Sequence, residues 1–210
     1  MKDKTVKTWT QELASKDGKY GGGSAASVVG AFATGLAQYV FELQQGKKKY
    51  HENEIEIQQA ITEAEKLTEE LLDLAEIDAD AFEPVLGLFK LPKDTEEERI
   101  TRKEKIDQGL ADAAKPPFDI MKKMDEVMDL FEELIALEVR GSIVDDIAVG
   151  LIFTQAVIES EKINCDVNIK AIKDEKLRNK LAQEADEAFH TTLERNQQLK
   201  ETTMKIINNN

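Results

Sequence analysis

An uncharged segment of eighteen residues, 24–41, constrains the fold of this chain more than any other feature of its sequence. A run of this length just reaches across a bilayer. It is rich in Gly, Ala, Ser and Thr, however, and it contains Gln38, so its drive to insert into a membrane is weak. We therefore predict a buried helix of a soluble bundle and no membrane partner.

The rest of the chain also follows helical spacing, and no stretch alternates for long enough to indicate a strand. Thr95 with Glu98 three residues later is typical of a capping box at a helix start. Pro116 and Pro117 suit the first turn of the next helix, and Pro84 is expected to kink or end a helix. We expect helices over residues 6–14, 24–45, 54–88, 95–114, 116–140 and 142–163, a break over 164–171, and a last helix from 174 onward.

This pattern predicts an all-α fold, a helical bundle in which long amphipathic helices wrap two buried, charge-poor central helices. A content of 6% aromatic residues and 4 prolines favours helices over a β-sandwich. The length fits a single domain, residues 1–210, of which we expect 207–210 to be frayed.

The formal net charge of −14 argues against nucleic acid as a partner, because such a surface repels phosphate backbones. The single cysteine, Cys165, allows no intrachain disulfide, and the charged N-terminus lacks an apolar signal run. Both features fit a cytoplasmic location. Cys165 has no basic neighbour in sequence and is interpreted as a buried structural thiol.

A glycine loop formed by Gly21, Gly22 and Gly23 precedes Ser24 at a predicted helix start. Glycines let a backbone approach a ligand, and the free amides of a helix start attract anions. The alternative is a tight turn in which Ser24 is only the N-cap. No Gly-Lys-Ser/Thr follows and no strand precedes, which excludes a P-loop and a Rossmann fingerprint.

Lys47, Lys48 and Lys49 form a basic run in an acidic chain. They provide either a landing site for the carboxylates of a ligand or merely solvated helix-end charges that complement the helix dipole.

Two pairs of aspartates are candidates for chemistry. Asp145 and Asp146 begin a predicted helix, where carboxylates also offset the helix dipole. Asp146 would share a face with Gly150, and a carboxylate turned into a bundle is costly unless it is paired or used. Asp78 and Asp80 raise the same question.

A metal site is not predicted. Glu187 and His190 match the Glu-x-x-His spacing of di-iron bundles, but such bundles need the motif twice. The other histidine, His51, has no matching motif.

Six motifs, taken in order, resemble those of the cyclodeaminase/cyclohydrolase family, which includes the cyclodeaminase domain of formiminotransferase-cyclodeaminase and bacterial stand-alone relatives. They are GGGSAA (21–26), LQQGKKKY (43–50), DADAF (78–82), LPKDTEEE (91–98), DIAV (146–149) and NCDVNI (164–169). The chain departs from the family pattern at Tyr20, which replaces a proline, and at Asp145, which replaces a serine. The loop 141–146 also lacks the family's asparagine.

The resemblance implies an all-helical homodimer that binds folate near the subunit interface. The reaction we expect is closure of 5-formimino-tetrahydrofolate to 5,10-methenyl-tetrahydrofolate with loss of ammonia. The alternatives are the related methenyltetrahydrofolate cyclohydrolase step, with water as nucleophile, and a non-catalytic folate-binding bundle, which the altered 141–146 loop suggests. Neither reaction needs a tightly bound cofactor or a metal.

We expect Asp146 and Asp78 to transfer protons or orient the substrate. The acidic surface should repel the tail of a folate, which is longer still when polyglutamylated, so a local basic patch is required. The expected substrate-binding residues are Gly21, Gly22, Gly23, Ser24, Lys47, Lys48, Lys49, Lys93, Asn164 and Asn168.

Overall fold

The computed structural model describes residues 4–209, and within them the chain is helical with no strand. The elements are α1 (Val6–Leu13), α2 (Gly22–Gln44), the 3-10 helix η1 (Lys48–Asn53), α3 (Glu54–Ala81), α4 (Glu83–Leu88), α5 (Glu96–Ala113), α6 (Lys115–Ala136), α7 (Val144–Ala171) and α8 (Glu175–Asn209). The predicted all-α fold is therefore confirmed. Residues 207–209, which we expected to fray, are part of α8, and Asn210 lies outside the described residues.

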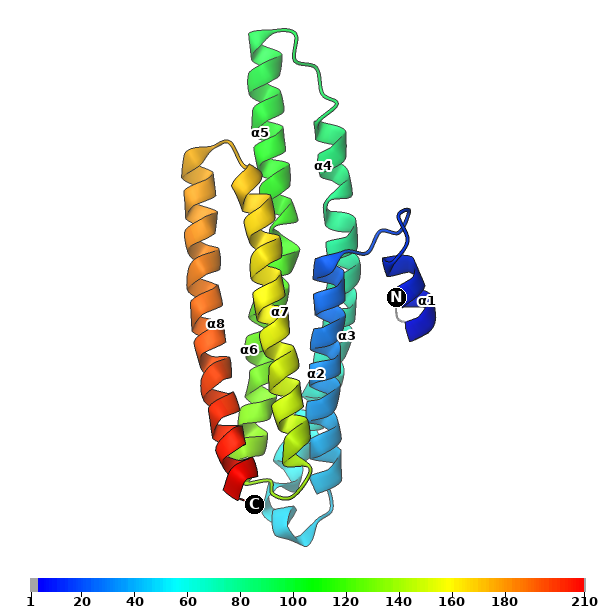
Figure 1. The fold of residues 1–210 in the computed structure, drawn as a ribbon, viewed down its shortest axis with the longest axis vertical. Coiled ribbons are helices and arrows are strands. Elements are labelled where there is room, and N and C mark those ends of the chain that lie inside the picture. Colours follow the sequence, from blue (N-terminus) through cyan, green and yellow to red (C-terminus); the bar gives the residue numbers. More distant parts are fainter. Residues whose placement is uncertain (1–3, 210) are drawn as a thin grey trace.

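Five long helices, α2, α3, α6, α7 and α8, run side by side along one axis, while α4 and α5 extend beyond the bundle as an arm (Figure 1). The core between the helices is apolar and tightly filled. Phe41, Leu67, Phe131 and Leu151 are among its largest side chains, and each is 0% exposed. Truncating such a side chain to alanine typically costs about 2–5 kcal/mol of stability.

The charge-poor helix α2 packs closely on its neighbours because its residues are small. Ala33 and Ala37 are 0% exposed, and a Cβ on Gly30 would lie 3.0 Å from Cε of Met124. Among the described helices, α2 alone is long and apolar enough to span a membrane, and 61% of the window that passes this test is buried in the bundle. Its packing against α3 and α7 agrees with the predicted bundle helix.

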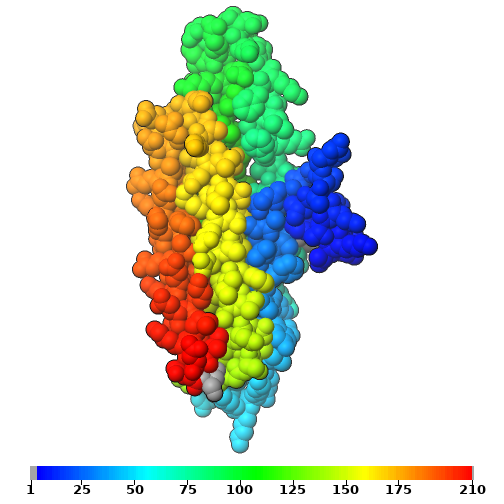
Figure 2. All heavy atoms as spheres, viewed as in Figure 1, coloured from blue at the N-terminus to red at the C-terminus, as the bar shows by residue number. Residues whose placement is uncertain are grey.

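One side of α2 and one side of α7 remain uncovered. The two helices lie next to each other on the face shown in Figure 2. The exposed residues along this side are mostly apolar, and Phe32 and Ile152 are 50% and 52% exposed. We call it the α2–α7 face, and its apolar residues are Val29, Phe32, Leu36, Tyr39 and Leu43 of α2 and Val149, Ile152, Ala156, Ile163 and Val167 of α7.

The helix predicted over residues 54–88 is divided in two, while the expected break near Pro84 and the predicted capping box at Thr95 are confirmed. α3 ends at Ala81 and α4 begins with Pro84 in its first turn. Oγ1 of Thr95 accepts a hydrogen bond from the Glu98 amide at 3.2 Å, and the Glu98 carboxylate accepts one from the Thr95 amide at 3.0 Å. This reciprocal capping box begins α5.

The expected break over residues 164–171 is wrong, because α7 continues to Ala171. Asparagine has a modest helix propensity, but tertiary contacts override it here. Cys165 and Ile169 lie one turn apart on the buried side of α7, where they pack with Ala114 and Ala185. Asn164 and Asn168 are therefore held at fixed positions on a helix and not in a loop.

Candidate active site

The carboxyl group of Asp78 lies at the start of α2. Asp78 belongs to the last turn of α3, and its Oδ2 accepts a hydrogen bond from Oγ of Ser24 at 3.0 Å. The Ser24 amide also donates to this carboxyl group. Burial raises the pKa of Asp78 above its usual value, and the hydrogen bonds from Ser24 oppose that rise. Asp78 is therefore a half-buried carboxyl group in a fixed orientation.

The glycine loop has a steric role that explains its sequence. α2 begins two residues earlier than predicted, with Gly21 as its N-cap, so the interpretation of Ser24 as the N-cap is wrong. A Cβ on Gly23 would lie 2.5 Å from Oδ1 of Asp78, and one on Gly22 would lie 3.5 Å from Oδ1 of Asn164. The missing side chains thus make room for polar groups from α3 and α7. The positive end of the α2 dipole acts on the protein's own Asp78 carboxyl group.

Sequence reasoning missed Glu161, which lies beside this cluster. Glu161 is 0% exposed, and its Oε2 accepts a hydrogen bond from Nδ2 of Asn164 at 3.1 Å. Its Oε1 is buried and has no hydrogen-bond partner. Burial, and to a smaller extent the negative charge of Asp78, raise the pKa of Glu161 to about 9. Glu161 is therefore protonated at neutral pH.

A sequence signal for Glu161 did exist. It falls between Ile158 and Cys165 at helical spacing, on the side of α7 that also carries Val157 and Ile169. A glutamate in such an apolar row indicates a buried acid, but only if α7 is recognised as one continuous helix.

Asn164 and Asn168 join the same site from α7. Nδ2 of Asn168 donates to the carbonyl oxygen of Ala113 at 3.1 Å, which ties α7 to the end of α5. Three segments distant in sequence thus bring polar groups to one place. We call the group Gly21–Gly23, Ser24, Asp78, Glu161, Asn164 and Asn168 the glycine half-site.

Asp80, the second aspartate of the DADAF motif, is not part of the glycine half-site. Its carboxylate pairs with Nζ of Lys19 at 2.8 Å and is mostly exposed. Tyr20, which stands where the family pattern has proline, is buried and donates to Glu76 at 2.8 Å. Lys19 and Tyr20 thus fasten the loop before α2 to α3.

The lysine run and Asp146 lie at the opposite end of the bundle (Figure 1). The 23 residues of α2 separate the lysines from the glycines by about 34 Å at 1.5 Å per residue. Asp146 is in the first turn of α7, fifteen residues or about 22 Å before Glu161. We call Lys47, Lys48, Lys49 and Asp146 the lysine half-site. Within one chain, the two predicted proton-transfer residues, Asp78 and Asp146, are not brought together.

Two of the lysines also have structural contacts. Nζ of Lys49 donates to the carbonyl oxygen of Glu138 at 2.8 Å, and Nζ of Lys47 donates to Oε1 of Gln44 at 3.0 Å. All three lysines are exposed, and Lys48 has no such contact among the described residues. Lys93 lies between α4 and α5, at the tip of the arm.

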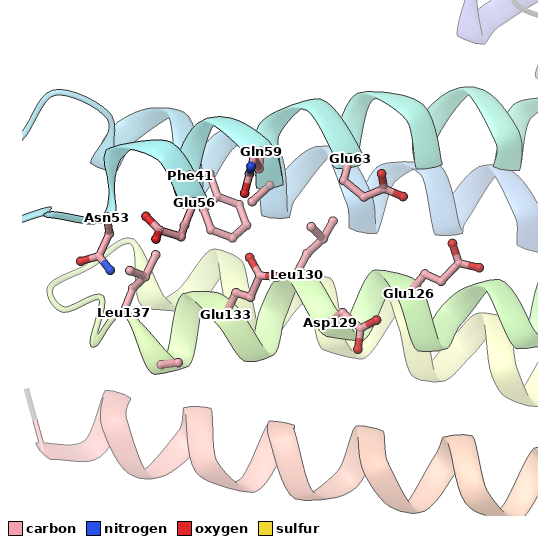
Figure 3. Close-up of a pocket in the computed structure, with 12 residues that line it drawn as sticks. Phe41, Asn53, Glu56, Gln59, Glu63, Glu126, Asp129, Leu130, Glu133 and Leu137 are labelled. Carbon is pink, nitrogen blue, oxygen red and sulfur yellow. The ribbon is translucent and has the colours of Figure 1, made fainter. Parts of the chain in front are cut away.

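Two cavities elsewhere in the bundle contain none of the predicted site residues. One of about 870 Å³ opens between α3–α4 and α5–α6. The other, of about 560 Å³, lies between α3 and α6, and carboxylates surround it (Figure 3). Glu56, Glu63, Glu126, Asp129 and Glu133 line it, and burial followed by the charge of Asp129 raises the pKa of Glu133. This acidic groove would repel an anionic folate tail.

The residues described by the structure contain no group of three or more His, Cys, Asp or Glu side chains placed to hold a metal ion. His190, considered above for a di-iron motif, packs its ring against Phe189 on α8. Cys165 is buried, and burial raises the pKa of its thiol to about 12, which agrees with a structural role.

The fold and the site define an all-helical protein that holds two neighbouring carboxyl groups in different environments, an arrangement suited to acid–base chemistry. A sequence model of the family described as formiminotransferase-cyclodeaminase matches residues 5–187, so the chain belongs to this family. It is an enzyme of the cyclodeaminase/cyclohydrolase group of folate one-carbon metabolism.

Three relatives illustrate the range of the family. Methenyltetrahydrofolate cyclohydrolase of Methylorubrum extorquens is 31% identical over 206 residues, 98% of this chain and 99% of that protein. Formimidoyltransferase-cyclodeaminase of Rattus norvegicus is 26% identical over 85% of this chain but only 33% of that protein. The crystal structure of formiminotetrahydrofolate cyclodeaminase from Thermotoga maritima matches with a TM-score of 0.78 and 27% identity, over 95% of this chain and 97% of that one.

Proposed function

We propose that this enzyme is a formiminotetrahydrofolate cyclodeaminase, which converts 5-formimino-tetrahydrofolate into 5,10-methenyl-tetrahydrofolate and ammonia. A bond forms between N10 and the formimino carbon, and the bond from that carbon to its terminal nitrogen breaks. The formimino group reacts as its protonated amidinium, so the one proton that leaves N10 completes the ammonia when it reaches the departing nitrogen. The positive charge remains on the methenyl product. The observation that carries the proposal is the oriented Asp78 carboxyl group beside a neutral Glu161. Proton transfer by such a group suffices without a tightly bound cofactor.

Asp78 is the group to which we assign proton transfer. Its raised pKa brings it closer to neutrality, where a carboxyl group both accepts and releases a proton more readily than an exposed aspartate does. The hydrogen bond from Ser24 fixes its direction. Asn164 donates to Glu161 through Nδ2, which leaves its Oδ1, near Gly22, to accept from a bound ligand.

The cyclohydrolase reaction is the second candidate. It is favoured by the 31% identity to the Methylorubrum extorquens protein, which extends over nearly the whole of both chains. In that reaction water attacks the methenyl carbon and Asp78 accepts one of its protons. The bond from carbon to N5 breaks as N5 takes the other proton of the water, and Asp78 releases its proton to solvent, which leaves the formyl group on N10. The same carboxyl group serves both reactions, so only the substrate distinguishes them.

Separate assays with each folate test the proposal. A cyclodeaminase generates methenyl absorbance and ammonia from 5-formimino-tetrahydrofolate. A cyclohydrolase removes methenyl absorbance faster than the uncatalysed rate. Activity on methenyl-tetrahydrofolate alone supports the cyclohydrolase reaction. If the enzyme converts neither folate, both proposed reactions are contradicted.

We further propose that the enzyme works as a homodimer through the α2–α7 face. This face exposes a row of apolar side chains, as an interface between subunits requires. The glycine half-site and the lysine half-site lie at opposite ends of the same two helices. A two-fold axis perpendicular to these helices places the glycine half-site of each subunit opposite the lysine half-site of its partner.

This arrangement accounts for three expectations together. Folate lies at the subunit interface, and no enclosed cavity of one chain is required to hold it. Asp78 of one subunit and Asp146 of its partner contribute to one site. The lysines then meet the carboxylates of the folate tail, including those added in polyglutamates.

A further inference from the structure

The buried carboxyl group of Glu161 has no role in packing that an apolar residue would not perform better. It is 0% exposed, and one of its two oxygens has no hydrogen-bond partner. An unsatisfied buried polar group of this kind costs about 1–3 kcal/mol. Such a cost is typical of residues that are kept for chemistry.

Glu161 and Asp78 act on each other electrostatically. Asp78 is half-buried and open to a ligand, whereas Glu161 is fully buried and closed to one. A ligand at this site therefore touches Asp78 and reaches Glu161 only through Asp78.

The charged groups around Glu161 come from four helices. α3 contributes Asp78, and the start of α2 offers only the uncharged Gly22, Gly23 and Ser24. On α7 itself, the Lys162 ammonium is bound by Asp166 and by Asp186 of α8, at 2.6 and 2.8 Å. The Cys165 thiol is protonated, and its neighbour from α6 is Asp119. No cation is therefore paired with Glu161 among the described residues.

We propose that Asp78 and Glu161 form an electrostatically coupled dyad that holds one proton, and that Glu161 is the positioning residue that retains this proton so that Asp78 alone acts on the substrate. The proposal rests on the function proposed above and adds a second carboxyl group to it. A fully buried carboxyl group with no cation paired to it does not ionise readily beside a second carboxylate.

The proton balance closes over one turnover. The resting dyad holds one proton, on Glu161. The substrate enters as the protonated amidinium, so its terminal nitrogen already carries two hydrogens. As the bond between N10 and carbon forms, the N10 proton moves to Asp78, and the dyad holds two. As the bond from carbon to the terminal nitrogen breaks, that nitrogen takes the proton from Asp78 and leaves as ammonia. The dyad again holds one proton and never carries more than one negative charge.

Loss of the retained proton stops this cycle. Ionised Glu161 would place a second negative charge beside Asp78, which would bind the N10 proton too tightly to return it to the departing nitrogen. Since the pKa of Glu161 is about 9, kcat of the wild-type enzyme should fall on the alkaline side. Glu161→Gln keeps a neutral side chain of the same shape and cannot ionise.

The test compares the pH profiles of wild-type enzyme, Glu161→Gln and Glu161→Asp. We expect kcat of Glu161→Gln, whatever its value at neutral pH, to lack the alkaline fall of the wild-type enzyme. Glu161→Asp should retain that fall. Glu133→Gln, which removes a carboxyl group of raised pKa in the acidic groove, is the matched control and should keep the wild-type profile. A wild-type alkaline limb that persists in Glu161→Gln would overturn the dyad.

Infrared spectroscopy tests the dyad without turnover. Wild-type enzyme at neutral pH should show a protonated-carboxyl band that Glu161→Gln lacks and Glu133→Gln retains. Absence of a band that depends on Glu161 overturns the dyad even in an active enzyme. If the band is present and neither folate is converted, the proposed function fails while the proton retained by Glu161 stands.

Discussion

The Asp78 carboxyl group closes over Gly23, so that its Oδ1 would lie 2.5 Å from a Cβ at that position. No other residue type fits there without moving the carboxyl group, because Cβ atoms do not approach oxygen so closely. The third glycine of the motif is thereby explained by contact with the enzyme's own side chain, in addition to any contact with a ligand.

Gly23→Ala should therefore reduce activity more than stability. The new methyl group displaces Asp78 from its hydrogen bond with Ser24, and an error of about 1 Å in a reacting group can cost about a hundredfold in rate. We expect kcat to fall by about ten- to a hundredfold. Gly87→Ala, in α4 with nothing within 4 Å of its Cβ, should leave kcat unchanged. Steady-state kinetics and thermal unfolding of both variants measure this contrast.

Asp78→Asn and Asp80→Asn remove the same charge at positions two residues apart. Comparing them distinguishes a role of Asp78 in proton transfer from a general effect of losing one negative charge. An amide at 78 keeps the shape of the side chain but cannot accept a proton, so kcat should fall by about a hundredfold or more. Asp80 forms an exposed ion pair with Lys19, and losing such a pair costs at most about 1 kcal/mol of stability. Asp80→Asn should remain within about twofold of wild-type activity. Equal losses in the two variants would remove Asp78 from the reaction.

The stability of the protein should fall as pH rises from about 4.5, the ordinary value for glutamate, to about 9, the pKa of folded Glu161. Between these values the folded state binds a proton at Glu161 that the unfolded state has released. The contribution of this one group reaches about 1.4 kcal/mol per pH unit. Urea unfolding at several pH values should show a steeper decline for wild type than for Glu161→Gln. Parallel pH dependences would show that Glu161 titrates normally.

Local sequence signals predicted most of the fold because each acts over a few residues. The Thr95 capping box, the Pro84 break and the small residues of α2 all operate within one or two helical turns. The end of α7 was misjudged because the contacts that stabilise it come from Ala114 and Ala185, which are distant in sequence.

The candidate site was only partly predictable for the same reason. The DADAF motif drew attention to Asp78, but periodicity could not show that Asp78 faces Ser24 while Asp80 faces Lys19. Burial of Glu161 depends on the packing of α7 against α2, α6 and α8, which one helical pattern does not reveal. The separation of the glycine and lysine half-sites likewise follows from the length of α2 once its two ends are fixed.

Replacing all three lysines by glutamine should raise KM for a polyglutamylated folate and leave kcat nearly unchanged. The increase should be smaller for the monoglutamate and should shrink as salt is added, because exposed charges are screened. Lys48→Gln is the cleaner single variant, since Lys47 and Lys49 also donate to Gln44 and Glu138. Lys176→Gln, an exposed lysine in the first turn of α8, is the control. If wild type and all the lysine variants have equal KM values for the monoglutamate and the polyglutamate, the lysines are only solvated helix-end charges.

Mixing two inactive variants tests whether Asp78 and Asp146 meet across a subunit interface. Asp146→Asn should lower kcat even though Asp146 lies about 22 Å along α7 from Glu161 in the same chain. In a mixed dimer of Asp78→Asn and Asp146→Asn subunits, both substitutions fall in one composite site, and the other site is intact. Random exchange makes half of the dimers mixed, so activity should recover to about a quarter of the wild-type value. The variants mixed without subunit exchange are the control. If exchange is complete and no activity returns, each site lies within one chain, and an Asp146→Asn variant with full activity excludes Asp146 from the reaction.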